Sequence, residues 1–260
     1  MDPAITPIPP DFANVVFKEV QGLELKLDLY LPHMPEAKEE APWVVWLSGG
    51  GWKHMGKGGA GRLAGWLVDH GIAVVGVEYR VSGQAVFPAQ IEDVRDAVRW
   101  VRAHAADYGL HPWLTGIWGD SAGGHLAALH GVTAEADLAV RAVCAFFPPC
   151  EMDHLDDFGD NREIPLLFGG PLKEKLDLAR EASPLHHVHA GAPPHFLAHG
   201  DEDKTVPIGQ SLRYFTTLRE AEVPCALEVL PGAGHNAPFY TAPETRAHVL
   251  AFFERCLLGA

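Results

Sequence analysis

Residues 114–131 read LTGIWGDSAGGHLAALHG. The apolar run LTGIW predicts a strand and HLAALHG predicts a helix, with a G-x-S-x-G pattern between them, centred on Ser121. A serine on a sharp strand-to-helix turn needs small neighbours, because the strained backbone passes close to adjacent elements. Such a turn lifts the hydroxyl above the sheet edge, at the positive end of the helix. We therefore interpret Ser121 as a candidate nucleophile.

Outward from this stretch, buried strands alternate with helical patterns. Apolar, β-branched runs predict parallel strands buried on both faces, and strict alternation predicts a strand covered on one face only. Strands buried on both faces are expected at residues 43–47, 72–79 and 143–147, further strands at 114–118, 196–198 and 226–230, and an edge hairpin or meander strand at 23–31. Helices are expected at 90–108, ended by Gly109, and from near Ser121, Ile208 and Ala242. This order predicts one α/β domain over residues 1–260, with a mostly parallel central sheet and helices on both faces.

Residues 148–194 are the irregular part of the chain. They contain acidic residues, an FGGP turn and one short amphipathic segment. Two interpretations stay open: a long surface connection, or a short cap-like insertion that shapes a pocket.

The composition excludes several classes of protein. The 260 residues carry a formal net charge of -14, which disfavours nucleic acid as a partner, and no apolar stretch approaches the roughly 18 residues of a membrane span. The four cysteines lack C-x-x-C spacing, so we expect reduced thiols and a cytoplasmic location. No cofactor motif is present, and the sequence indicates no oligomeric state.

A nucleophilic serine needs a base, and the base needs an acid that holds it in the correct tautomer. The glycine-rich loop PGAGH presents His235 after one predicted strand, and the loop GDEDK offers Asp201 and Asp203 after another. Both loops lie where catalytic groups gather in open α/β sheets. The residues alone leave the two aspartates as alternatives. A metal site at the histidines near residue 187 is not favoured, because no second cluster has ligand spacing.

An oxyanion needs backbone N–H donors fixed before the reaction. Ala122, the residue after the serine, offers one donor, and the loop SGGGW after strand 43–47 offers Gly50 and Gly51. A phosphate-binding loop is the rival interpretation, but Lys53 is not followed by serine or threonine as that motif requires.

Together these motifs resemble the esterase/lipase branch of the α/β-hydrolase fold, in particular bacterial acetyl-xylan and feruloyl esterase-like carboxylesterases. The resemblance covers most of the chain, including SGGGW, WGDSAGGHLAALHG, HGDEDKTVP and GAGH. It implies that Asp203 is the acid, because Asp203 occupies the acid position of the HG-x-x-D-x-x-V-P pattern. Ser48 stands where that family usually has histidine. The motifs are also similar to those of kynurenine formamidases, so amide substrates stay open.

We therefore expect a serine carboxylesterase acting on a small-molecule ester with a short-chain, aromatic or sugar acyl group, through an acyl-enzyme intermediate. Ser121, Asp203 and His235 form the expected triad, and Gly50, Gly51 and Ala122 the oxyanion hole. Trp52 and Phe87 are the candidates for substrate contact. Because His235 must be neutral to act as base, we expect activity to fall as the pH is lowered from about 8 to about 5. The alternatives are a formamidase-like amidase and a catalytically silent binding protein on the same fold.

Overall fold

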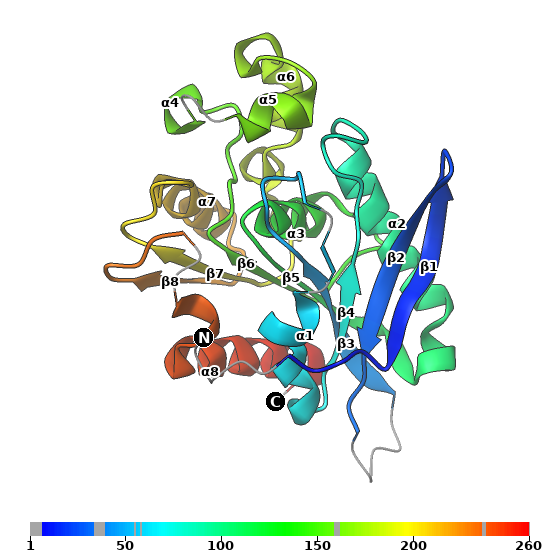
Figure 1. Cartoon of the computed structure of the whole chain (residues 1–260). Coiled ribbons are helices and arrows are strands. Elements are labelled where there is room, and N and C mark those ends of the chain that lie inside the picture. Colours follow the sequence, from blue (N-terminus) through cyan, green and yellow to red (C-terminus); the bar gives the residue numbers. More distant parts are fainter. Residues whose placement is uncertain are drawn as a thin grey trace.

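A computed structural model describes residues 7–33, 40–54, 56–57, 59–158, 162–235 and 238–259. One eight-stranded sheet crosses the molecule in the order β1-β2-β4-β3-β5-β6-β7-β8 (Figure 1). The strands are β1 (Phe12–Val20), β2 (Leu23–Tyr30), β3 (Ala41–Leu47), β4 (Ala73–Val77), β5 (Leu110–Asp120), β6 (Ala142–Phe146), β7 (His195–Gly200) and β8 (Cys225–Leu230). β1 and β2 pair antiparallel, as do β2 and β4, and all other pairs are parallel. The predicted mostly parallel sheet is confirmed.

Helices cover both faces of this sheet. One face packs against α2 (Ala89–Ala103), α3 (Ala122–Thr133) and α7 (Gly209–Glu220), and the opposite face against α1 (Ala60–Leu63), η1 (Gly65–His70) and α8 (Pro243–Phe253). Alternate residues of β3 enter the two cores: Val45 packs with the α2 and α3 side, and Trp46 with the α8 side. A strand that is buried on both faces must be apolar at every position, which explains the run WVVWL.

The predicted strands are all present. β2, predicted as an edge hairpin or meander strand, pairs antiparallel with β1 at the edge of the sheet, so this prediction is confirmed. The edge strand is β1, which the sequence pattern did not reveal. Its residues are mostly exposed, Asn14 has a positive φ of 58°, and the pairing with β2 shifts register twice, so the strand has no clean alternation.

Residues 148–194, here called the cap segment, form short helices above the carboxyl ends of the strands (Figure 1). They are α4 (Leu155–Phe158), α5 (Glu163–Phe168), η3 (Leu172–Glu174), α6 (Leu176–Glu181) and η4 (Pro184–His187). The packed core includes Phe158, Ile164 and Leu167 of this segment, each at most 5% exposed. These side chains are packed, whereas in a plain surface connection they would be exposed.

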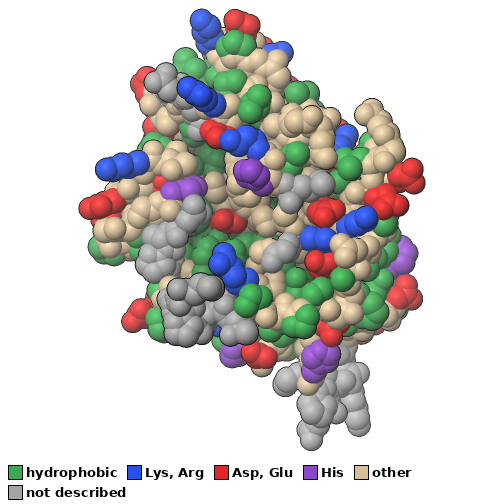
Figure 2. All heavy atoms as spheres, in the orientation of Figure 1, with side chains coloured by type: hydrophobic (Ala, Val, Ile, Leu, Met, Phe, Trp, Pro, Cys, Tyr) green, Lys and Arg blue, Asp and Glu red, His purple; other side chains and the backbone are tan. Residues whose placement is uncertain are grey.

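The face of the molecule in Figure 2 carries lysine and arginine side chains scattered singly among acidic and apolar ones. Within the described ranges, no helix has the length and apolar character needed to cross a membrane. All four cysteines are free thiols, and Cys144 and Cys150 are buried.

Candidate active site

Ser121 lies on a strained turn between β5 and α3. Its backbone has φ 50° and ψ −119°, a region that side-chain-bearing residues seldom adopt. Two glycines permit this turn. A Cβ on Gly119 would lie 2.4 Å from the backbone of Gly123, and a Cβ on Gly123 would lie 2.0 Å from the carbonyl oxygen of Leu47. The glycines of the G-x-S-x-G pattern are therefore required by close backbone approach.

The loops after β7 and β8 bring Asp203 and His235 to Ser121. His235 Nε2 lies 3.0 Å from Ser121 Oγ, and His235 Nδ1 lies 2.6 Å from Asp203 Oδ2. Since a carboxylate can only accept, Nδ1 carries the proton, and Nε2 is left to accept from the serine hydroxyl. Three side chains from three separate loops thus form one hydrogen-bonded chain.

The alternative acid, Asp201, points elsewhere. Its Oδ1 accepts from the backbone N–H of Gly232 at 2.6 Å, which closes the turn after β8. Asp203 is the aspartate that the structure brings to His235.

The surroundings of Asp203 favour its ionised form. Burial alone would raise the pKa of this carboxyl, but hydrogen bonds with His199 and His235 and from the Val206 amide outweigh it and hold the pKa well below its usual range. Oδ1 accepts from the N–H groups of Thr205 at 2.8 Å and Val206 at 3.0 Å. An ionised carboxylate is thereby held in one orientation toward His235.

Residues 48–53, here called the glycine loop, follow β3 and border Ser121. Gly49 N–H donates to Asp120 Oδ1 at 2.8 Å, and the Ser48 carbonyl accepts from the Tyr79 hydroxyl at 2.7 Å. Ser48 Oγ lies 3.2 Å from Trp46 Nε1, so the serine at this position accepts a hydrogen bond from the underlying strand. Gly50 and Gly51 have φ of 116° and 60°, conformations that favour glycine.

A cavity of about 340 Å³ opens over Ser121 and His235. Its lining comes from the glycine loop with the adjoining His54, the loops of Ser121, Asp203 and His235, and the cap segment: Gly50, Gly51, Trp52, Lys53, His54, Ser121, Pro149, Phe158, Glu163, Ile164, Thr205, Val206 and His235. Trp52, a candidate for substrate contact, is part of this lining. Phe87 is not part of this lining. It packs edge-to-face on Phe168 of the cap segment, with ring centroids 6.2 Å apart.

His125, which the sequence analysis missed, connects the glycine loop to the cap segment. Its Nε2–H donates to the carbonyl of Ala182 at 2.6 Å, which leaves Nδ1 to accept from Trp52 Nε1–H at 3.3 Å. The side chain is fully buried, and burial lowers the pKa of His125 to about 4, so the ring is neutral near neutral pH. Among many histidines, its place one helical turn after Ser121 was the available signal.

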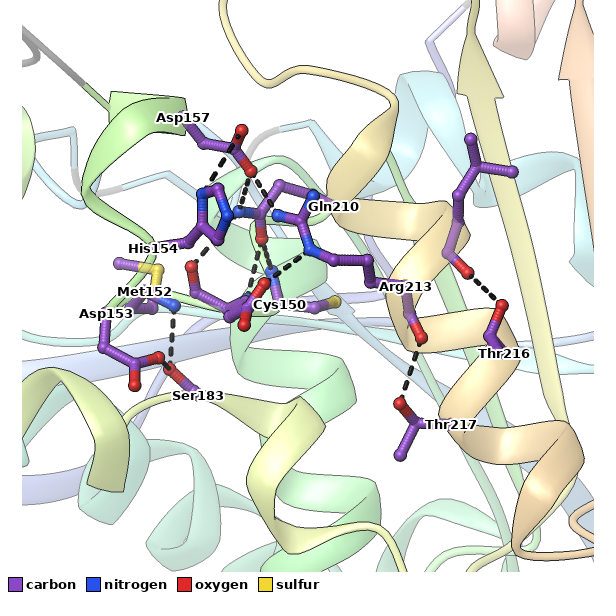
Figure 3. A network of polar contacts seen from close by, with 12 residues as sticks. Cys150, Met152, Asp153, His154, Asp157, Ser183, Gln210, Arg213, Thr216 and Thr217 are labelled. Atoms are coloured by element: carbon purple, nitrogen blue, oxygen red, sulfur yellow. Dashed lines mark hydrogen bonds and ion pairs between the residues drawn. The ribbon is translucent and has the colours of Figure 1, made fainter.

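The base of the cap segment is tied to α7 by a polar network (Figure 3). Gln210 is fully buried; its Oε1 accepts from the N–H groups of Cys150 and Glu151, each at 2.7 Å, and its Nε2 donates to Asp157 Oδ2 at 2.7 Å. Arg213, on the same helix, pairs with both Glu151 and Asp157. The segment is therefore fixed where it leaves the sheet.

The histidines considered for a metal site have separate partners. His186 Nε2 contacts Asp153, His187 Nε2 donates to the carbonyl of Glu181, and His189 Nδ1 accepts from the Gly191 N–H. In the part of the chain that the structure describes, no three His, Cys, Asp or Glu side chains are grouped as metal ligands would be.

The chain is similar to known proteins in sequence and in structure. The chain is 32% identical over 246 residues to "Esterase LipQ" of Mycobacterium tuberculosis, covering 88% of this chain and 58% of the relative. It is 26% identical to an "Acetylxylan esterase" of Xylanibacter ruminicola, covering 82% of this chain and 43% of the relative. The chain thus spans about half the length of the curated relatives it matches.

Among solved structures, a truncated carbohydrate esterase from gut microbiota superposes with a TM-score of 0.87 at 27% identity, covering 99% of both chains. The expected α/β-hydrolase fold is thereby confirmed. The family model described as BD-FAE matches residues 27–218. The chain belongs to the BD-FAE family and has the α/β-hydrolase fold.

Proposed function

We propose that this protein is a serine carboxylic ester hydrolase, with Ser121 as nucleophile, His235 as general base and Asp203 as the acid that orients it. The observation that carries the proposal is the hydrogen-bonded chain from Ser121 Oγ through His235 to Asp203, with distances of 3.0 and 2.6 Å. These lie in the range that proton transfer between a nucleophile and its base requires.

The acylation step follows from this chain. Ser121 Oγ attacks the ester carbonyl carbon while His235 Nε2 takes the hydroxyl proton, and the carbonyl oxygen becomes an oxyanion. His235 then returns the proton to the leaving alkoxide, which departs as the alcohol. Asp203 stays ionised and stabilises the imidazolium that forms between the two transfers.

In deacylation, water takes the place of the alcohol. His235 removes a proton from water, the hydroxide attacks the acyl carbon, and the acid product leaves as Ser121 Oγ regains its proton. The N–H groups of Gly50, Gly51 and Ala122 would stabilise the oxyanion in both steps. Their proximity to Ser121 supports this role: the two glycines line the same cavity, and Ala122 begins α3.

The cavity supports small ester substrates. At about 340 Å³ it lies at the low end of ligand pockets, and its lining combines apolar Trp52, Phe158 and Ile164 with polar Lys53 and Glu163. The names of two similar proteins, an acetylxylan esterase and a carbohydrate esterase, favour a short acyl group on a hydroxyl-bearing alcohol. We propose that the cap segment, within a single domain, bounds this pocket.

Hydrolysis of p-nitrophenyl acetate by the folded wild type and Ser121→Ala tests the proposal. We expect the wild type to turn over and the variant to lose at least about a thousandfold in kcat. A wild type that is inert to esters but cleaves N-formylkynurenine would favour the amidase instead. Inertness to both would favour a silent binding protein.

A further inference from the structure

An ion pair lies in the lining of the cavity. Lys53 Nζ, at the end of the glycine loop, lies 2.7 Å from Glu163 Oε1, at the start of α5 in the cap segment. The two residues are separated by 110 positions in the chain. Both line the cavity that Ser121 also lines, so the pair joins the glycine loop to the cap segment there.

Glu163 also contacts the glycine loop through its stem. A Cβ built on Gly51 would lie 2.5 Å from Glu163 Cγ, so the side chain packs directly on the backbone of Gly51. Gly51 has φ of 60°, a conformation that favours glycine, and the absence of a side chain there lets the Glu163 stem approach the backbone. The glutamate therefore contacts the loop at two points, the Gly51 backbone and the Lys53 ammonium.

The electrostatics of the pair agree with the geometry. The hydrogen bond from Lys53 lowers the pKa of Glu163, so the carboxylate is charged at neutral pH. The side chains are 38% and 31% exposed, which leaves the pair open to screening by salt.

We propose that Glu163 is a positioning residue: with Lys53 it forms a latch that holds the glycine loop with the N–H groups of Gly50 and Gly51 directed at the oxyanion. The inference rests on the proposed esterase function and deepens it. A latch that acts on the loop affects the transition state, where the oxyanion exists, more than it affects ground-state binding.

The test compares steady-state hydrolysis of p-nitrophenyl acetate by Glu163→Ala, Glu163→Gln, Lys53→Met and the double variant Lys53→Met/Glu163→Gln. Losing one fixed oxyanion donor lowers kcat by about 100- to 1,000-fold, so a loosened loop should lower kcat about tenfold, with KM within about twofold. Glu163→Gln keeps the stem on Gly51 and should retain more activity than Glu163→Ala. The double variant should resemble the single ones, because each removes the same contact.

Salt gives an independent readout. Raising NaCl should lower the kcat of the wild type toward that of Lys53→Met, while Lys53→Met itself stays nearly constant. Arg99→Met, which breaks the exposed Arg99–Asp96 pair on α2, is the matched control and should keep wild-type kcat. Thermal unfolding of every variant checks that differences in kcat are not differences in folded fraction.

Three results would overturn the latch: wild-type kcat in Glu163→Ala, a loss confined to KM, or additive effects in the double variant. Ser121→Ala is assayed alongside. If it retains wild-type activity, the proposed function itself fails. If it is inactive while Glu163→Ala behaves as wild type, only the latch fails.

Discussion

At the scale of single residues, the site depends on backbone positions that only particular side chains tolerate. Ser121 is held at φ 50° by hydrogen bonds on both sides: its N–H donates to Phe146 O at 2.9 Å, and its carbonyl accepts from His125 N at 2.8 Å. Strain of this kind persists only where surrounding contacts over-determine it. The backbone hydrogen bonds thereby fix Ser121 in the lining of the cavity.

Substitution of the two aspartates in the loop after β7 should have very different effects on kcat. Asp203→Asn removes the charge that holds His235 in its tautomer and should lower kcat by about 10,000-fold, as loss of the acid does in triads generally. Asp201→Asn is the matched control. Asp201 only accepts from Gly232, so kcat should stay within about twofold. Kinetics with p-nitrophenyl acetate check both, and equal losses would contradict the assignment.

His125 should affect both stability and rate. His125→Phe leaves the Trp52 indole N–H and the Ala182 carbonyl without partners, each at a cost of about 1–3 kcal/mol in unfolding free energy. Because Trp52 belongs to the glycine loop, we also expect kcat to fall. His130→Phe is a control on the same helix, because His130 contacts the Leu138 carbonyl instead. It should destabilise without lowering kcat, and a similar kcat loss in both would contradict a role for His125 at the site.

At the scale of elements, the cap segment depends on α7. Gln210→Leu keeps the side-chain volume but leaves the buried N–H groups of Cys150 and Glu151 without an acceptor (Figure 3). We expect it to lower the unfolding free energy by about 2–5 kcal/mol, measured by urea denaturation. Thr216→Val, on the exposed side of the same helix, should change it by less than about 0.5 kcal/mol. Equal stabilities for both variants would show that the network does not hold the cap segment.

Elements with strong periodicity could be predicted from the sequence, and those defined by tertiary contacts could not. The helix pattern at 90–108 corresponds to α2 followed by η2 (Ala105–Tyr108), ended by Gly109 in a left-handed conformation as expected. β5 starts at Leu110, earlier than expected. The sequence did not reveal this start, because residues 110–113 include His111, Pro112 and an exposed Trp113 rather than an apolar run. The helices of the cap segment are three to six residues long, too short for periodicity to reveal them.

At the scale of the whole molecule, the site lies where the order of strand addition reverses, on either side of β3. The chain crosses from β3 to β4 on one side and then returns to β5 on the other, so the loops after β3 and β5 diverge at their carboxyl ends. The glycine loop follows β3, and Ser121 follows β5. Motifs at strand ends were sufficient to predict Ser121, His235 and the glycine loop. Contacts such as Lys53–Glu163 join residues far apart in sequence, so spacing gives no sign of them.

Three buried histidines should make stability depend on pH. Burial lowers the pKa of His125, His130 and His195 to about 4, while the same side chains in the unfolded chain titrate near 6.5. As pH falls below 6.5 the unfolded state therefore binds protons that the folded state does not, and stability is lost until about pH 4. Each histidine contributes about 1.4 kcal/mol per pH unit in the middle of this window.

Urea denaturation between about pH 7.5 and pH 5 measures this loss. His130→Leu removes one of the three groups and should reduce the slope by about one proton per molecule. A free energy of unfolding that is constant over the range would contradict neutral buried histidines.

The central claim, that Ser121 is the nucleophile, is tested most directly by intact-protein mass spectrometry after exposure to a fluorophosphonate. The account predicts one phosphonyl adduct per chain on the wild type, located on the peptide that contains Ser121, and none on folded Ser121→Ala. An unmodified wild type, or an adduct that persists in Ser121→Ala, would contradict it.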